Sequence, residues 1–176
     1  RIQRHRPLLH LSRRIMSTEN AVRDRYANAA QAKEDSLCCA VNYDAQYLKA
    51  IPEEVIERDY GCGDPSRYLR EGETVLDLGS GTGKICFIAS QVVGPKGRVI
   101  GVDMTDEMLE LARRNAPIVA ETIGHAYVKF RRGRIQDLAL DFDLLDAELK
   151  CARFDGLKGF LEAEAIAAKL RSESPM

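Results

Sequence analysis

Three glycines stand at alternate positions directly after a short apolar stretch that carries one carboxylate. The stretch is 75–78, the carboxylate is Asp77, and the glycines are Gly79, Gly81 and Gly83. A chain of this kind lets a ligand approach the bare backbone, because glycine has no side chain. A carboxylate at this place repels a pyrophosphate but suits a ligand that carries an ammonium group. The pattern therefore predicts a binding loop for such a ligand.

The glycine spacing differs from the dinucleotide-binding fingerprint, which is G-x-G-x-x-G. The third glycine comes one residue early, and Lys84 stands where the fingerprint requires glycine. A second acid supports ligand binding, because Asp103 ends the apolar segment 98–103, about 20 residues after the loop. An acid at the carboxyl end of a strand can accept hydrogen bonds from both hydroxyls of a ribose. Taken alone, Asp103 could equally cap a helix or lie on the surface.

The segments around these residues predict alternating strands and helices, which is typical of a parallel sheet with crossover helices. The predicted strands are 75–78, 98–103 and 127–131, and the predicted helices after the loop are 84–93, a segment from Thr105, 143–150 and 156–171. Pro117 should kink or restart the helix that begins after Thr105. In the last helix, the inward-facing residues should be Leu157, Phe160, Leu161 and Leu170.

Right-handed crossovers place the three strands in the order 3-2-1, so the first strand lies at an edge. The fold class is therefore α/β, an incomplete doubly wound, Rossmann-like fold in which later strands are missing. A complete sheet of this kind needs about six or seven strands. We expect the chain to behave as the ligand-binding half of an enzyme, marginally stable or self-associated and catalytically silent alone, because an open apolar edge invites pairing.

Two motifs resemble known enzymes. Residues 75–83 look like motif I of class I S-adenosylmethionine-dependent methyltransferases. Tyr-Gly-Cys-Gly at 60–63, about fifteen residues earlier, and Val-Asp-Met-Thr-Asp-Glu-Met-Leu at 102–109 resemble the arsenite methyltransferase family, to which the chain is similar from about Val22 onward. The resemblance implies methyl transfer from S-adenosyl-L-methionine to trivalent arsenic.

The resemblance also implies roles for residues at matching positions. The methionine part of the cofactor would lie on Gly79, Ser80, Gly81 and Gly83, with Asp77 at its edge. Asp103 would hold the ribose hydroxyls, and Met104, Ile135 and Gln136 would contact the adenine, with Tyr60 reaching over the cofactor. Many relatives carry an acid at position 136. Glutamine still offers a carbonyl to the exocyclic amine, so we expect weaker discrimination there rather than loss of binding.

The thiols are the implied site for arsenic. Trivalent arsenic is soft and prefers thiolate ligands. Cys62 would be one arsenic-binding thiol, and either Cys38 or Cys39 would be another. Cys86 falls inside the predicted helix 84–93 and reads as core, whereas Cys151 matches no family position. Three sulfurs around arsenic leave its lone pair free, so no general base is essential and alignment with the methyl group dominates catalysis.

Composition limits the partners. Over 176 residues, 26 Lys and Arg face 27 Asp and Glu, which leaves no overall field to attract nucleic acid or an anionic membrane. No apolar run approaches the roughly 18 residues of a membrane span. Five irregularly spaced cysteines favour reduced cytoplasmic thiols over a disulfide framework. The histidines, His5, His10 and His125, form no cluster, so no metal site is predicted.

The organisation follows from these motifs. We expect a disordered or non-native leader at 1–16, a helical and loop segment with the candidate arsenic-binding cysteines at 17–73, the cofactor-binding half at 74–137, and a helical insert at 138–176 that ends early. The expected partners are arsenite or its thiol conjugate and a thiol reductant. Two alternatives stay open: a methyltransferase acting on carbon or another small molecule, and a non-catalytic fragment that binds the cofactor weakly or not at all.

Overall fold

The structure of the protein is a computed structural model that describes residues 18–34, 37, 41–125, 128–150 and 156–174. The predicted leader 1–16 and the thiols of Cys38, Cys39 and Cys151 lie outside the described residues. Within the described part of the chain, no helix combines the length and the apolar character that crossing a bilayer requires.

A three-stranded parallel sheet forms the centre of the described chain. Its strands are β1 (Thr74–Leu78), β2 (Arg98–Asp103) and β3 (Val128–Arg132), in the order β1-β2-β3. Asp77 of β1 stands opposite Gly101 of β2. The predicted strand order is therefore confirmed, and so is the α/β class with three parallel strands of a Rossmann-like arrangement. At the β1 edge, Leu76 and Leu78 are 45% and 42% exposed.

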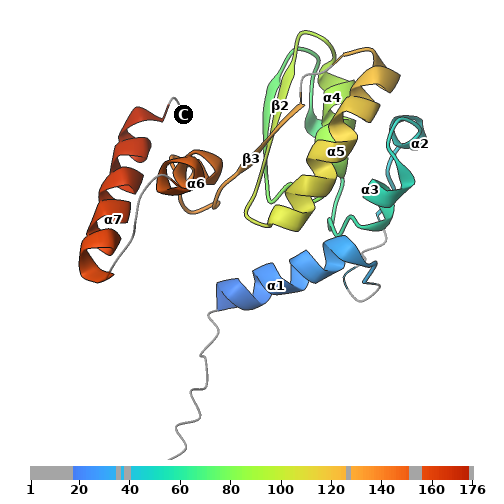
Figure 1. Cartoon of the computed structure of the whole chain (residues 1–176). Helices are drawn as coiled ribbons and strands as arrows, with labels where there is room; N and C mark the ends of the chain where they lie inside the picture. Colours follow the sequence, from blue (N-terminus) through green and yellow to red (C-terminus); the bar gives the residue numbers. More distant parts are fainter. Residues whose placement is uncertain (1–17, 35–36, 38–40, 126–127, 151–155, 175–176) are drawn as a thin grey trace, which may run out of the picture.

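Two crossover helices cover one face of this sheet. They are α4 (Lys84–Val93) and α5 (Asp106–Ile123), which lie on the same side of the strands in Figure 1. Both connections are right-handed, and this handedness brings consecutive crossover helices to one face. Phe87 of α4 and Phe130 of β3 meet edge to face, with ring centroids 5.6 Å apart. The core between helices and sheet fixes the carboxyl ends of β1 and β2 side by side.

The N-terminal segments pack against these two crossover helices. They are α1 (Thr18–Gln31), α2 (Ala45–Leu48), α3 (Glu53–Glu57) and the 3₁₀ helix η2 (Pro65–Tyr68). Figure 1 shows α1 crossing below the N-terminal end of α5. There Ala29 and Ala30 form a buried cluster with Tyr60 and Met108. This cluster holds the segment of Tyr60 close to the carboxyl ends of the strands.

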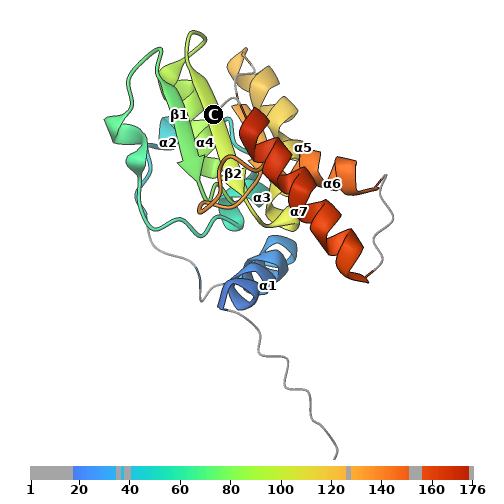
Figure 2. The same cartoon turned by 90° about the vertical axis from the view of Figure 1, so that its left-hand side faces the viewer.

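The last two helices, α6 (Phe142–Lys150) and α7 (Gly156–Glu173), lie on the other side of the sheet from α4 and α5 (Figures 1 and 2). Phe160 and Leu161 are 60% and 59% exposed, so their predicted inward orientation is wrong. Among the residues of α7 whose burial is described, the buried ones are Gly159 and Ala167. Leu170, three positions after Ala167 on the same side of the helix, is partly buried. The side chain of Leu157 is not described.

Pro117 does not restart the helix in which it lies. α5 continues from Asp106 to Ile123 with Pro117 inside it, and Gly124 ends it in a left-handed conformation. Proline removes one hydrogen bond and costs about 3 kcal/mol in a helix interior. Leu111 before it and Val119 after it are both buried on the sheet side. Burial on both sides of the proline keeps the two halves in one helix.

Candidate functional site

The glycine loop, residues 79–83, follows the carboxyl end of β1 and leads directly into α4. Its three glycines have φ angles of 79°, 52° and 86°, which L residues with side chains rarely adopt. The backbone amides of Gly79 and Ser80 donate to the carbonyl oxygen of Val102, at 2.8 and 3.0 Å. The loop is therefore tied to β2 as well as to its own strand, and its shape depends on the pairing of the two strands.

Asp103, the last residue of β2, holds the same loop through its side chain. Its Oδ2 atom accepts a hydrogen bond from the amide of Gly81 at 2.9 Å, and its Oδ1 atom accepts one from the amide of Thr105 at 2.8 Å. Each carboxylate oxygen has a second lone pair available. Asp103 therefore fixes the loop and can still accept the hydroxyls of a ligand.

A cleft of about 980 Å³ opens beside the loop, between the strand ends and the N-terminal segments. Ten of the residues predicted from the sequence line this cleft. They are Tyr60, Cys62, Asp77, Gly79, Ser80, Gly81, Asp103, Met104, Ile135 and Gln136. The structure thus brings together residues that the sequence spreads over more than seventy positions.

The sequence also predicts that Gly83 contacts the ligand, but the structure places it against the sheet rather than among the residues that line the cleft. A Cβ atom built on Gly83 would lie 2.6 Å from the ring of Phe130 and 3.3 Å from Cβ of Ala112. Real Cβ atoms essentially never show a contact as short as the first of these. Glycine at this position therefore allows α4 to start close to β3 and α5.

Asp77 lies half-buried at the base of the cleft, beside the fully buried thiol of Cys86. The Cys86 Sγ atom donates to Asp77 Oδ2 at 3.2 Å. Burial raises the pKa of Asp77, the hydrogen bond from Cys86 opposes this, and the charges of Asp59 and Asp103 raise it further. Burial and the neighbouring carboxylate raise the pKa of Cys86 well above its ordinary value. Cys86 is therefore a thiol that supports Asp77, not a reactive thiolate.

The hydroxyl of Ser80 indicates that the cleft suits a polar ligand. The residue is only 5% exposed, and its hydroxyl has no hydrogen-bond partner within the described part of the chain. Buried polar atoms are nearly always hydrogen-bonded in native proteins. The unpaired hydroxyl lies in the loop that lines the cleft, close in the chain to the carboxylate of Asp77. A ligand with both an ammonium group and acceptor oxygens fits this part of the cleft.

Tyr60 lies at the edge of the cleft, but its hydroxyl is engaged elsewhere. It donates to the carbonyl of Ala29 at 3.0 Å and accepts from the amide of Glu34 at 3.0 Å. Its ring meets the ring of Tyr26 edge to face. Tyr60 therefore anchors the segment before Cys62 to the end of α1, and it offers the cleft its ring rather than its hydroxyl.

The described thiols occupy contrasting positions. Cys62 is exposed and lines the cleft, whereas Cys86 is fully buried in α4. Among the described residues, no group of histidine, cysteine and carboxylate side chains could hold a metal ion. Of these two described thiols, Cys62 is thus the one that a bound molecule in the cleft could reach.

Sequence reasoning missed one buried ion pair beside the cleft. Lys84 Nζ lies 2.5 Å from Asp59 Oδ2, and these side chains are 7% and 9% exposed. The sequence does single out each residue: Lys84 stands where the dinucleotide fingerprint has glycine, and Asp59 precedes the Tyr-Gly-Cys-Gly motif. Their pairing across 25 positions could not be read from either residue alone.

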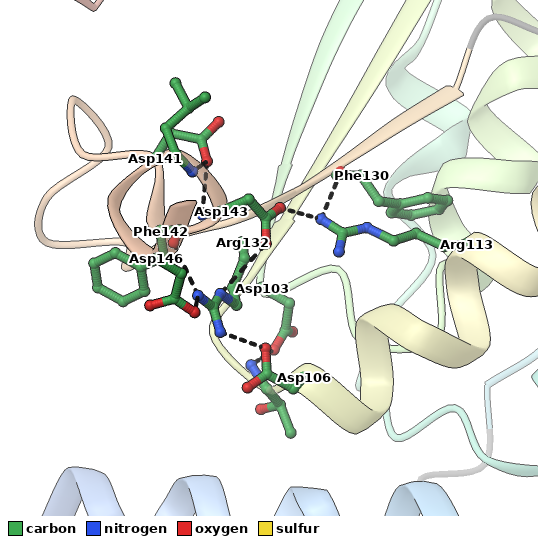
Figure 3. A network of polar contacts seen from close by, with 11 residues as sticks. Asp103, Asp106, Arg113, Phe130, Arg132, Asp141, Phe142, Asp143 and Asp146 are labelled. Atoms are coloured by element: carbon green, nitrogen blue, oxygen red, sulfur yellow. Dashed lines mark hydrogen bonds and ion pairs between the residues drawn. The ribbon is translucent and has the colours of Figure 1, made fainter. Parts of the chain in front are cut away.

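A network of polar contacts joins the end of β3 to α5 and α6, as Figure 3 shows. The Arg132 guanidinium pairs with Asp106 at 2.9 Å and with Asp146, and it donates to the carbonyl of Phe142 at 2.8 Å. Arg113 adds hydrogen bonds to the carbonyl of Phe130 and to Asp143. The beginning of α6 is therefore fixed at the end of β3 and the start of α5, near Asp103.

Comparison with known families places this arrangement in a wider group. The family described as "Methyltransferase domain" matches residues 69–168. An arsenite methyltransferase of Aquipseudomonas alcaligenes is 41% identical over 126 residues, covering 68% of this chain and 36% of the relative. An arsenite methyltransferase of Halobacterium salinarum is 39% identical over 145 residues, with coverage of 69% and 36%. The chain thus spans about a third of the length of these curated relatives.

A solved structure is similar over part of the chain. It is an arsenic(III) S-adenosylmethionine methyltransferase from Chlamydomonas reinhardtii, 38% identical, with a TM-score of 0.49. The similarity covers 53% of this chain and 32% of that chain.

Proposed function

Because the chain belongs to the methyltransferase domain family, we propose that it binds S-adenosyl-L-methionine and serves methyl transfer to trivalent arsenic. The observation that carries this proposal is the cleft, which the glycine loop, Asp103 and the exposed thiol of Cys62 line together. The names of the similar arsenite methyltransferases support arsenic as the acceptor.

Different residues of the chain would bind different parts of the cofactor. Asp77 would attract the ammonium group, and the hydroxyl of Ser80 would gain the partner that it lacks within the described residues. Asp103 would accept hydrogen bonds from the ribose while it holds the amide of Gly81. Ile135 and Gln136, both exposed at the cleft, would contact the adenine together with Met104. The cofactor, when bound, supplies an electrophilic methyl group on a sulfonium sulfur.

Cys62, which lines the same cleft, would hold the arsenic substrate. A soft trivalent ion prefers thiolates to the carboxylate and hydroxyl oxygens nearby. We propose Cys38 or Cys39 as a further arsenic thiol, since both lie in the same N-terminal segment as Cys62. Arsenic held by sulfur carries a lone pair without a proton, so the protein's task is alignment rather than proton removal.

The segments of the chain and its location in the cell can be assigned on the same grounds. We assign 17–73 to the arsenic thiols, 74–137 to the cofactor and 138–176 to a helical insert. Arsenic capture requires reduced thiols, which supports a cytoplasmic location and a thiol reductant as partner. The formal net charge of −1 fits a small-molecule substrate, arsenite or its thiol conjugate, better than nucleic acid. Detoxification of arsenic is the biological role that this reaction would serve.

Calorimetric titration of the purified chain with S-adenosylmethionine, and separately with NAD, tests the cofactor assignment. We expect binding of the first and none of the second, because the loop lacks the dinucleotide spacing and carries Asp77 beside it. Tight binding of NAD would overturn the assignment.

Titration with phenylarsine oxide, a trivalent arsenical, tests the acceptor. Cys62→Ser should reduce arsenical affinity at least tenfold while cofactor affinity stays within twofold, because serine is a poor ligand for a soft ion. Cys151→Ser, which matches no position of the family, serves as the control. If Cys62→Ser binds both ligands as the wild type does, a methyltransferase acting on carbon or another small molecule becomes the better reading.

A further inference from the structure

The buried ion pair of Lys84 and Asp59 joins helix α4 to the thiol loop, which we define as residues 59–63. Lys84 is the first residue of α4 and directly follows the glycine loop. Its Nζ atom lies 2.5 Å from Asp59 Oδ2, and both side chains are more than nine-tenths buried. A buried pair of this kind contributes little net stability compared with an apolar pair, because both charges lose their hydration. The effect of this pair therefore lies in the groups that it holds in place.

Asp59 also contacts Gly61, the residue before Cys62. The same Oδ2 atom that meets Lys84 accepts a hydrogen bond from the amide of Gly61 at 3.2 Å. A Cβ atom on Gly61 would lie 3.2 Å from that oxygen and 3.6 Å from the hydroxyl of Tyr43. A side chain at position 61 would therefore crowd the carboxylate of Asp59, while its contact with the Tyr43 hydroxyl would be an ordinary one. Glycine there allows the carboxylate to reach the backbone.

Tyr43 completes the arrangement on the residue after Cys62. The ammonium of Lys84 lies 3.9 Å from the centroid of the Tyr43 ring, within the range of a cation–π contact. The hydroxyl of Tyr43 donates to the carbonyl of Gly63 at 3.1 Å. Lys84 thus acts on both neighbours of Cys62, through Asp59 on one side and through Tyr43 on the other.

We propose that Lys84, Asp59 and Tyr43 are positioning residues that fix the direction of the Cys62 thiol relative to the glycine loop. The proposal rests on the proposed function, because it assigns this clamp of three residues to the capture of trivalent arsenic in the cofactor cleft. Glycines on both sides give the thiol loop many accessible conformations, and fixing both flanking peptide groups removes most of that freedom. Arsenic capture then depends on the clamp, whereas the cofactor is assigned mainly to the glycine loop and to Asp103 at the end of β2.

Tyr43→Phe is the most selective test, because it removes only the hydroxyl and keeps the ring under the ammonium. We expect the dissociation constant for phenylarsine oxide to rise about fivefold or more, while calorimetric affinity for S-adenosylmethionine stays within twofold. General destabilisation would weaken both ligands, so this split separates positioning from a structural role. Tyr47→Phe, in the neighbouring helix α2 and outside the residues that line the cleft, is the matched control.

Charge variants test the other half of the clamp. Lys84→Arg keeps a cation beside Asp59 and should retain arsenical affinity. Removing one charge alone leaves the other buried and unpaired, so the double variant Lys84→Met/Asp59→Asn is used instead. It should bind the arsenical at least tenfold more weakly than the wild type and still bind S-adenosylmethionine.

The two proposals fail in different ways. If Cys62→Ser weakens arsenical binding but Tyr43→Phe and the double variant bind it as the wild type does, the clamp is refuted and the function stands. If Cys62→Ser itself binds the arsenical normally, the arsenic assignment fails and the clamp proposal fails with it. A loss of cofactor affinity in Tyr43→Phe equal to its loss of arsenical affinity would show that Tyr43 has a general structural role.

Discussion

The thiol of Cys86 donates a hydrogen bond to Asp77 across 3.2 Å, from the first turn of α4 to the carboxyl-end half of β1. The contact needs space, which Gly101 of the neighbouring strand provides. A Cβ atom there would lie 2.8 Å from the Cys86 Sγ atom. A residue that reads as core filler in the sequence thus supports the carboxylate that we assign to the ammonium group of the cofactor.

Cofactor affinity should depend on pH through Asp77. Burial raises its pKa, and the nearby charges of Asp59 and Asp103 add to this, so its carboxylate is protonated at a higher pH than an ordinary aspartate. Binding of S-adenosylmethionine should weaken as the pH falls through that raised pKa, because the neutral acid no longer attracts the ammonium group. Cys86→Ala should move the midpoint upward and Cys86→Ser downward, measured by calorimetry across pH. A midpoint that both variants leave unchanged would contradict this role for Cys86.

Asp77 should also make the stability of the unliganded protein depend on pH. A carboxyl group whose pKa is raised on folding stabilises the folded state in its protonated form. This contribution is fully present at pH values below the ordinary aspartate pKa and is lost as the pH rises through the raised pKa. Asp77→Asn should remove this part of the pH dependence of Tm. Asp24→Asn, an exposed aspartate paired with Arg23, is the control that should leave it in place.

Asp103→Ala should weaken S-adenosylmethionine binding by about 1.5–3 kcal/mol, the usual contribution of hydrogen bonds to a charged group. This corresponds to a roughly 10- to 150-fold increase in Kd. The variant also releases the amide of Gly81, so the glycine loop should become more open to hydrogen exchange. Calorimetry measures the first effect and exchange mass spectrometry the second. Unchanged affinity would show that the ribose lies elsewhere.

Gly83→Ala should destabilise the fold through two separate costs. The left-handed φ of 86° costs an alanine about 1–2 kcal/mol, and overpacking against Phe130 costs about 1–3 kcal/mol. Gly124→Ala is the matched comparison, since Gly124 has a φ of 79° but a Cβ atom there would meet no atom within 4 Å. It should lose only about 1–2 kcal/mol. Urea unfolding of the two variants checks the difference, and equal losses would mean that Phe130 moves aside freely.

Arg132→Met should release α6 from the end of β3. The Arg132 guanidinium contacts three acidic side chains and the carbonyl of Phe142, and its side chain is only 15% exposed. Hydrogen exchange should therefore speed up in α6 while α4 stays protected. Arg23→Met, which breaks an exposed ion pair on α1, should change neither helix. Protection of α6 that survives Arg132→Met would show that apolar contacts hold this helix.

The sequence by itself determined the strands, the glycine loop and the order of the sheet. Glycine spacing, apolar runs and helix-ending glycines act over a few residues, and right-handed crossovers leave one arrangement for three consecutive parallel strands. The same rules put Asp77 and Asp103 at neighbouring strand ends, where both line the cleft. Local pattern and connection handedness were sufficient for these features.

Only the tertiary structure decided which side chains meet across segments. Lys84 and Asp59 lie 25 positions apart, and no local pattern predicts their pairing. They meet because α4 and the thiol loop pack together. Gly83 shares the loop pattern of Gly79 and Gly81, yet the ring of Phe130 makes it a packing position. Phe160 and Leu161 fit a core pattern in the sequence, but they are exposed, whereas Gly159 and Ala167 of the same helix are buried. Periodicity gives the faces of a helix, whereas the neighbour that arrives in three dimensions selects the face that is buried.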